Sequence, residues 1–429
     1  MTEHQSVEYN LDEKYVFSPG IRKTALIAVG AGVLLVLLGI VMAIFGGGHE
    51  AHGGEHAEHA GHGIVWLKRL FANLWINNVY FTGIAVIGVF FVALQYVSWA
   101  GWATVILRIP QSFGFFLPIG GVMMVLLFLV AGHDLFHWTH EGLTEEGSPN
   151  FDEVIAKKSA FLNTPFFLAR MVAYLVIWFS FFWFTRQRSL REDEEGGVLQ
   201  HDRNITLSAF FIIFFAITSS MAAWDWSMSV DPHWFSTMYG WYTFASWFVA
   251  GLSTIMLATI YLKEQGYLPM VNESHLHDLA KLMFAFSIFW TYVWFSQFML
   301  IYYANIPEET SHFNEIFEGF GGMYKPMFFL NIFINFLFPF LALMTRDSKR
   351  KIRILKIVAW TLLAGHWLDF YLNMTPYILG AEGGIGFMEL GVVAIYAGVF
   401  VLVVGTAISK APLIPKNHPM LQESLHHNI

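Results

Sequence analysis

The sequence predicts an all-α integral membrane protein with about ten transmembrane helices. Of its 429 residues, 56% are hydrophobic and only 13% are charged, and the mean hydropathy is +0.51. A soluble globular chain carries about 25% charged residues, so the composition excludes a soluble enzyme. Aromatic residues make up 17% of the chain, which suits a lipid-facing surface with rings at the interfaces. Because backbone polar groups in lipid must be satisfied internally, a helical bundle is the expected architecture.

Ten apolar stretches have the length of a transmembrane helix, since a bilayer core of about 30 Å needs about 20 residues. They are residues 22–45, 79–99, 113–133, 164–185, 205–226, 239–262, 280–303, 326–345, 352–373 and 384–408.

The distribution of basic residues predicts the orientation. Of the 24 Lys and Arg residues, 18 fall in segments on the N-terminal side of the membrane. Because Lys and Arg accumulate in cytoplasmic loops, both termini are expected in the cytoplasm.

Several functional classes are excluded by what the chain lacks. It has no cysteine, which removes disulfides, Fe–S clusters, thioether-linked haem and thiolate zinc sites. The net charge of -8 offers no signal for nucleic-acid binding. The histidines within the predicted spans lie towards the outer face of the membrane. Two stacked haems need axial histidines at both depths, and the inner half of the membrane offers none within a span. We therefore expect no catalytic residue, no cofactor and no metal in this chain.

The segment after the first span is rich in glycine and histidine, with His49, His52, His56, His59 and His62. A solvated low-complexity loop is one interpretation. Weak transition-metal binding is the alternative, and spacing does not separate the two. The amphipathic stretch that follows, residues 64–75, is expected to form a helix on the outer membrane surface.

Two spans share a short pattern that suggests an internal repeat. Asp225 and Asp369 each lie in the outer part of a span, an aromatic residue follows, and Pro232 and Pro376 come seven residues after the acids. These spans are four apart and run in the same direction, which predicts two four-helix bundles as a parallel repeat, plus two peripheral helices. The expected divisions are a cytoplasmic segment 1–21, the first helix and His-rich loop 22–78, the first bundle 79–238, the second bundle 239–383, and the last helix and cytoplasmic tail 384–429.

Ionisable residues within the spans need an explanation, because a charge at a helix centre costs about 2.5–3.5 kcal/mol. His133, His137 and His140 are spaced for one helix face, and Asp134 can pair with His137. A neutral imidazole beside a carboxylate suits proton acceptance from a quinol or a proton exit. The alternative is a polar cap where the helix leaves the membrane.

Further candidates lie on other spans. His366 and Asp369 share one face, and Arg170 is the expected counter-charge for one of the acids, although a structural ion pair is the alternative. Lys281 marks a candidate entrance on the inner side, or a snorkelling anchor. A path of hydroxyl and amide groups between the two sides is offered by Ser253, Thr254, Ser287, Thr291, Ser296 and Asn335.

Two motifs resemble those of a known family. One runs from His277-Asp278-Leu279-Ala280-Lys281 through Trp294-Phe295-Ser296-Gln297 to Asn305-Ile306-Pro307-Glu308-Glu309-Thr310, and the other is Gly132-His133-Asp134-Leu135-Phe136-His137-Trp138. They are similar to the signature of the NrfD/PsrC-like integral membrane subunits of alternative complex III. The resemblance covers most of residues 79–408 and is strongest to the shorter, ActF-like type.

The resemblance implies a subunit of a quinol:cytochrome c or quinol:oxidase oxidoreductase in the bacterial inner membrane. It implies as partners a larger ActC-like paralogue, an Fe–S subunit, and multihaem and monohaem cytochrome c subunits, with lipid around them and menaquinol as candidate quinol. The Fe–S clusters and c-type haems would lie in those partners. ActF-like chains are proposed to carry a proton pathway and to support assembly. The candidate pathway groups are His133, Asp134, His137, Asp225, His366, Asp369 and Lys281, with Arg170 as counter-charge.

Two other functions remain open from the residues alone. A purely structural scaffold subunit would need buried polar groups only for packing. A stand-alone secondary transporter would also combine parallel repeats with polar groups within the membrane.

Overall fold

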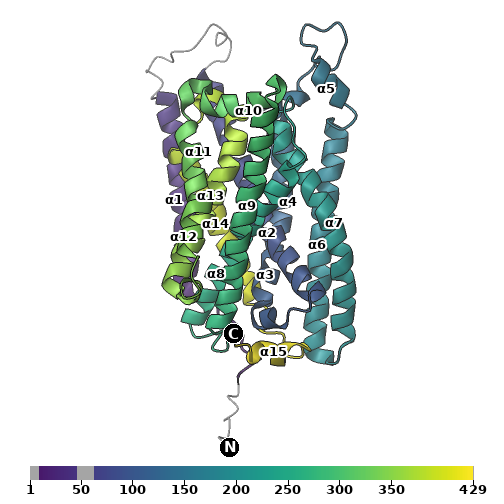
Figure 1. Ribbon diagram of the computed structural model, residues 1–429, viewed down its shortest axis with the longest axis vertical. Coiled ribbons are helices and arrows are strands. Elements are labelled where there is room, and N and C mark those ends of the chain that lie inside the picture. Colours follow the sequence, from purple (N-terminus) through teal and green to yellow (C-terminus); the bar gives the residue numbers. More distant parts are fainter. Residues whose placement is uncertain (1–8, 46–61, 429) are drawn as a thin grey trace, which may run out of the picture.

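The computed structural model describes residues 9–45 and 62–428, and within these residues the chain is helical without a β-strand. Long helices run side by side, and both termini lie at the lower end (Figure 1). Nine helical segments of the described chain are long and apolar enough to cross a membrane. The predicted all-helical class is therefore confirmed, and the segments support a multi-pass membrane protein. The long helices are α1 (Pro19–Phe45), α2 (His62–Val97), α4 (Leu117–Leu135), α6 (Thr164–Glu195), α7 (Leu199–Trp226), α8 (Tyr239–Glu264), α9 (Glu273–Ala304), α13 (Ile352–Leu379) and α14 (Phe387–Ile408).

Shorter elements complete the chain. One of the nine segments, Lys325–Ala342, joins α11 (Lys325–Ile332), a π-helical turn η6 (Phe333–Leu337) and α12 (Phe338–Ala342). The other short helices are η1 (Gly101–Ile106), α3 (Arg108–Phe113), η2 (Gly114–Phe116), η3 (His137–Thr139), α5 (Glu153–Lys158), η4 (Met228–Val230), α10 (Pro307–Phe317), η5 (Gly319–Gly322), η7 (Ser348–Arg350), η8 (Gly380–Glu382) and α15 (Leu421–Leu425).

The ninth predicted span lies in α13, which is 28 residues long but is not among the nine. Lys356, His366 and Asp369 lower its hydropathy. Two of these side chains, His366 and Asp369, are buried in the protein rather than facing lipid. The count of ten spans stays a prediction.

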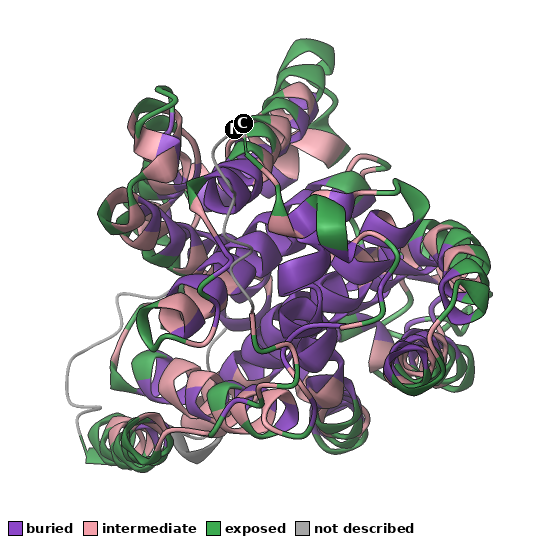
Figure 2. Cartoon of the chain, turned by 90° about the horizontal axis from the view of Figure 1, so that it is seen from below, coloured by how far each residue is buried: buried purple, intermediate pink, exposed green. Residues whose placement is uncertain are grey.

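By their order in the chain, the membrane helices can be named as an N-terminal group (α2, α4, α6 and α7) and a C-terminal group (α8, α9, α11, α12 and α13). In the N-terminal group, α2 packs against α4 and α7, and α6 packs against the same two helices. In the C-terminal group, α8 packs against α9 and α13, and α11 packs against α13. Helix α8 also contacts α2 and α7, which joins the groups. Seen from below, buried residues gather in the centre and exposed residues on the outer helices (Figure 2).

Helix α1 lies at the edge and packs almost entirely along α14. Only 11% of its apolar span is buried. Glycines allow the close approach: a Cβ on Gly32 would lie 2.6 Å from the Gly391 carbonyl, and one on Gly391 would lie 2.7 Å from the Gly32 carbonyl. Small residues at such crossings let membrane helices pack backbone to backbone.

The amphipathic stretch 64–75 is not a separate surface helix, so that expectation was wrong. It forms the first turns of α2, and the expected division at 78/79 falls inside this helix. Its polar face meets protein rather than water: Asn73 donates to Glu389 Oε1 over 2.9 Å, and Trp75 donates to the Trp226 carbonyl over 2.8 Å. The glycine- and histidine-rich segment, interpreted as a solvated loop or as a weak metal-binding site, lies outside the described residues, as does the side chain of His62.

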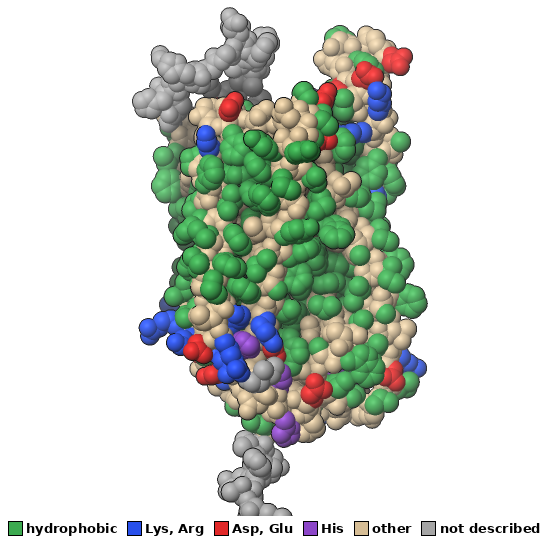
Figure 3. All heavy atoms as spheres, in the orientation of Figure 1, with side chains coloured by type: hydrophobic (Ala, Val, Ile, Leu, Met, Phe, Trp, Pro, Cys, Tyr) green, Lys and Arg blue, Asp and Glu red, His purple; other side chains and the backbone are tan. Residues whose placement is uncertain are grey.

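Charged side chains lie mainly at the two ends of the face seen in Figure 3, and hydrophobic side chains fill the band between them.

Helix α6 runs further than predicted, to Glu195. Asn163 caps its N-terminus and a proline follows in the first turn, and no helix-breaking residue occurs before Gly196. The extra turns carry Arg186, Glu192 and Asp193 into buried positions at the lower end.

Candidate functional site

Asp225, near the end of α7, is fully buried and held by a cation. Arg170 of α6 donates from Nε to Oδ2 over 2.9 Å and from a terminal nitrogen to Oδ1 over 2.7 Å. The Tyr174 hydroxyl donates to Oδ2 over 3.0 Å. The guanidinium also donates to the Phe161 carbonyl and lies 3.8 Å from the centre of that residue's ring. Both carboxylate oxygens and the cation therefore have close partners.

Asp369, in α13, is equally buried but has a different environment. Its Oδ1 accepts hydrogen bonds from the Tyr242 hydroxyl and from Asn331 Nδ2, the latter over 2.9 Å. Its Oδ2 accepts from Ser246 Oγ over 2.8 Å and from Trp290 Nε1 over 3.1 Å. These four donors come from α8, α9 and α11, and all of them are neutral.

The two carboxylates occupy comparable places in the two helix groups. Each lies on the last helix of its group, and each contacts the preceding membrane segment: Asp225 contacts Arg170 of α6, and Asp369 contacts Asn331 of α11. The partner from the preceding segment is a guanidinium at Asp225 and a neutral amide at Asp369. The two acids that share a short sequence pattern therefore also have similar positions relative to the neighbouring helices.

His366 is connected to Asp369 through a hydroxyl. Ser246 Oγ lies 3.0 Å from His366 Nδ1 and 2.8 Å from Asp369 Oδ2. A hydroxyl has one proton to donate and can accept another. When Ser246 donates to the carboxylate, it accepts from a protonated Nδ1, and His366 Nε2 is then an acceptor.

Several buried polar atoms of the C-terminal group have no hydrogen-bond partner within the described residues, and buried groups of this kind bind water in native proteins. They include His366 Nε2, Ser253 Oγ, Ser287 Oγ and Asn335 Oδ1, and also Trp247 Nε1, Gln297 Oε1 and Thr375 Oγ1. Asn335 lies in the π-helical turn η6, a backbone irregularity frequent at functional sites. Thr254 and Thr291 bond their own helix carbonyls instead.

The three-histidine motif does not form one helix face, so that expectation was wrong. Helix α4 ends at Leu135 because Phe136 adopts an extended backbone, and His137 lies in the short turn η3. No hydrogen bond or ion pair joins Asp134 to His137 among the described residues. The chain nevertheless folds back, so that the rings of His133 and His140 stack 4.0 Å apart.

His137 instead has histidine neighbours at the upper end of the N-terminal group. Its ring lies 5.1 Å from that of His140 and 6.3 Å from that of His233. Burial lowers the pKa of His137, and the two neighbouring rings lower it further. His233 Nε2 lies 2.6 Å from Asp152 Oδ2. His137 is therefore neutral near pH 7 and can accept a proton.

Lys281 lies at the lower end of α9, where it pairs with Asp278 over 2.5 Å. The other oxygen of Asp278 lies 2.6 Å from Nε2 of His427 in the C-terminal tail. His277 is nearby in sequence, and its Nδ1 has no partner in the described chain. Lys281 thus belongs to a small network that holds the tail against α9.

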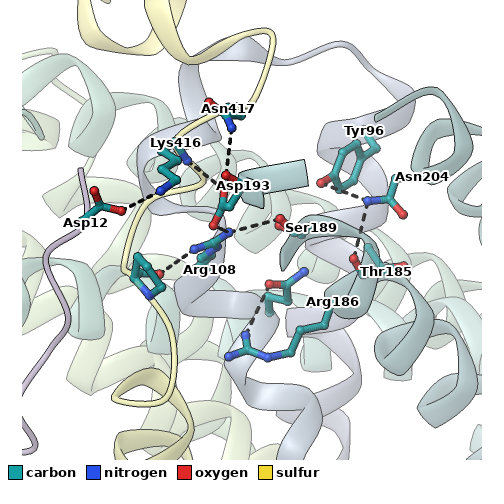
Figure 4. Close-up of polar contacts among 12 residues, drawn as sticks. Asp12, Tyr96, Arg108, Thr185, Arg186, Ser189, Asp193, Asn204, Lys416 and Asn417 are labelled. Atoms are coloured by element: carbon teal, nitrogen blue, oxygen red, sulfur yellow. Dashed lines mark hydrogen bonds and ion pairs between the residues drawn. The ribbon is translucent and has the colours of Figure 1, made fainter. Parts of the chain in front are cut away.

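A second network closes the lower end of the N-terminal group (Figure 4). Arg108 of α3 pairs with Asp193 of α6 and donates to the Pro412 carbonyl over 2.9 Å. Asp193 also accepts from the Lys416 amide over 3.0 Å, and the Lys416 ammonium pairs with Asp12 over 2.9 Å. Both chain ends are therefore tied to the same helices.

Sequence reasoning missed two buried ionisable groups beside this network. Glu192 is fully buried, and neither of its oxygens has a hydrogen-bond partner; its closest basic atom is His201 Nδ1 at 3.9 Å. Arg186 is 5% exposed; it donates to Gln111 and to the Ala407 carbonyl over 3.4 and 3.5 Å, and its guanidinium lies 5.1 Å from the centre of the Phe115 ring. Both residues lie beyond residue 185, where the fourth predicted span ends.

Another ion pair, not predicted from the sequence, joins the buried Glu389 to Arg69, whose side chain is 26% exposed. Glu389 of α14 accepts from Arg69 of α2 at both oxygens, over 2.7 and 2.8 Å, and from Asn73 over 2.9 Å. It also caps its own helix by accepting from the Gly386 amide. The pair fastens α14 to α2 and is fully satisfied.

Within the described residues, no group of three or more His, Asp or Glu side chains is arranged to hold a metal ion. No family model matches the chain, and no curated protein matches it.

Proposed function

We propose that this chain is a cofactor-free membrane subunit of a quinol-oxidising complex of the alternative complex III type, and that it conducts protons through its C-terminal helix group. One observation carries the proton pathway: Asp369 is buried with four neutral donors, and no cation pairs with it among the residues that the structure describes.

The contrast with Asp225 explains why Asp369 suits proton transfer. Protonating Asp225 would leave Arg170 as a buried unpaired charge, which costs about 3–5 kcal/mol. Protonating Asp369 leaves no such charge behind. Its carboxyl group can therefore exchange a proton at a smaller cost, provided that a donor or acceptor is within reach.

Ser246 and His366 supply that reach. His366 Nε2 first accepts a proton that arrives through water, which gives an imidazolium. The imidazolium then passes its Nδ1 proton to Ser246 Oγ while the Ser246 proton moves to Asp369 Oδ2, so that a neutral imidazole and a neutral carboxylic acid remain. Ser253, Ser287 and Asn335 offer buried polar atoms for water within the same group.

The remaining candidates are assigned by position. His133, Asp134 and His137 form the proposed outer end of a path in the N-terminal group, with Glu192 added at the lower end. Lys281, paired with Asp278, marks the proposed inner entrance of the C-terminal group. Proton movement would have to be driven by a neighbouring redox subunit, through coupling to a two-state element.

The proposal includes ten spans in two four-helix bundles, α1 and α14 as peripheral helices, and both termini in the cytoplasm. Its supports are the two motifs around His133 and Lys281, the absence of cysteine, and the distribution of Lys and Arg.

A scaffold role is the second candidate, and the Arg170–Asp225 and Arg69–Glu389 pairs favour it. In both pairs the carboxylate accepts from the arginine at both oxygens, and each pair joins two different helices, so they can stabilise the helix packing.

Isolation of the native complex in mild detergent tests the proposed membership. We expect the chain to co-migrate with Fe–S and multihaem cytochrome c subunits, and the visible spectrum to show c-type haem. A colourless species that contains this chain alone would contradict membership and would favour the transporter.

A further inference from the structure

An elongated cavity lies between α13 and α14. These helices follow each other in the chain but barely touch, because α13 packs on α8 and α14 packs on α1 and α2. The space left between them has a volume of about 720 Å³ and opens sideways. Its floor is formed by Tyr80, Phe81 and Phe113, and its walls include Ala364, Trp367 and Ala397.

The groove extends over the depth of a membrane. Along α14 its lining runs from Leu390 to Ile408, a rise of about 27 Å, close to the roughly 30 Å of a bilayer core. A transmembrane helix does not fit, since 30 Å of a helix about 10 Å wide fills roughly 2,400 Å³. One or two hydrocarbon chains match both the length and the volume.

Most polar atoms of the lining are already used by the protein. Tyr80 donates to the Leu363 carbonyl over 2.8 Å, Trp367 donates to Asn77 over 3.0 Å, and Thr254 donates to its own helix. The lining that the occupant of the groove meets is therefore mainly hydrocarbon.

The lower mouth of the groove carries positive charge. Tyr15 and Ile21 line this end, and the neighbouring residues Lys14, Arg22 and Lys23 are exposed. The side chains of Arg22 and Lys23 make no hydrogen bond or ion pair within the described residues. Basic residues beside a gap between membrane helices attract anionic lipid headgroups.

We propose that this groove is a binding site for an anionic phospholipid, with its acyl chains between α13 and α14 and its phosphate beside Arg22 and Lys23. Helices α1 and α14 pack on each other at the edge of the protein. The bound lipid fills the space between this helix pair and the other helices.

Native mass spectrometry of the full chain in detergent, titrated with dioleoyl phosphatidylglycerol or dioleoyl phosphatidylcholine, tests this site. We expect one high-affinity site that prefers phosphatidylglycerol. Ala364→Phe fills the groove and should remove the site, whereas Ala31→Phe, on the exposed face of α1, should retain it. Arg22→Gln with Lys23→Gln should weaken phosphatidylglycerol binding by about 30-fold, or about 5-fold for each cation, and leave phosphatidylcholine unchanged.

The double charge variant lies at the exposed lower end and keeps the test valid if Ala364→Phe misfolds. Equal affinity for the two lipids, or full retention of phosphatidylglycerol by the charge variant, would overturn the proposal. Copurification of a quinone or a polypeptide that Ala364→Phe displaces would overturn it as well.

Discussion

His366 and Asp369 lie one turn apart on α13 and share a single partner, the Ser246 hydroxyl, which is 3.0 Å from the imidazole and 2.8 Å from the carboxylate. The serine comes from α8, so the link also joins two helices. Within the described residues, no Lys or Arg side chain forms an ion pair with this acid, in contrast to Asp225 with Arg170. On this difference rests the proposal that Asp369 exchanges protons whereas Asp225 holds helices together.

Removal of the shared hydroxyl should interrupt proton transfer. Ser246→Ala leaves His366 and Asp369 in place without the group that connects them, so the proton-to-electron ratio of the reconstituted complex should fall while its assembly is retained. Thr254→Val on the same helix is the control, because the Thr254 hydroxyl bonds only the Ala250 carbonyl. A ratio that is the same in both variants would contradict the relay.

The Arg170–Asp225 pair should contribute to stability. Arg170→Gln leaves a buried carboxylate without its cation, which should lower the free energy of unfolding by about 3–5 kcal/mol. The double variant Arg170→Gln/Asp225→Asn should recover part of this loss, since no charge is then unpaired. Thermal unfolding in detergent measures both. Lys157→Gln, in an exposed pair with Glu153, is the control that should leave the midpoint unchanged.

The Arg69–Glu389 pair should hold the peripheral helices. Glu389→Gln removes the carboxylate that accepts two hydrogen bonds from Arg69. The first turns of α14, together with α1, should therefore exchange amide hydrogens faster. Glu264→Gln is the matched control, because Glu264 forms an exposed pair with Lys356. Equal exchange in the two variants would show that the packing of α14 on α2 suffices.

The C-terminal tail should loosen in mild acid. Burial, together with His201 and Arg108, lowers the pKa of His418 to about 3, whereas a free histidine titrates near about 6.5. Between these values the released tail binds a proton that the docked tail does not, so docking weakens as the pH falls below about 6.5. The free energy of docking the tail falls by about 2 kcal/mol at pH 5.

Hydrogen exchange of residues 411–427 at pH 7.5 and 5.5, corrected for intrinsic rates, measures this release. We expect protection to fall at the lower pH, and His418→Gln to reduce the difference. Protection that is independent of pH would contradict a buried neutral His418.

Sequence patterns predicted the helical class well because apolar runs of membrane length are local signals. They also singled out Asp225, Asp369, Arg170 and His366, since ionisable groups are conspicuous in such runs. The donors around Asp369 could not be found in this way: Tyr242, Ser246, Trp290 and Asn331 come from three other helices, and tertiary packing decides which hydroxyl or amide faces the acid.

Three errors arose at helix ends. The continuation of α6 to Glu195 was missed because a run of charges at a span end also fits a solvated loop. The extended backbone at Phe136, which ends α4 before His137, has no marker such as glycine or proline in the sequence. The start of α2 was misplaced because its polar asparagines face other helices rather than water.

Asp369 is proposed to carry protons through the C-terminal group. The most direct measurement is the proton-to-electron ratio of the complex in vesicles with Asp369→Asn, beside Glu264→Gln as a carboxylate control at the exposed lower end. Asparagine keeps the size and can still accept hydrogen bonds, but it does not titrate. We predict intact assembly and a reduced ratio for Asp369→Asn alone. An unchanged ratio in assembled Asp369→Asn complex would contradict the pathway.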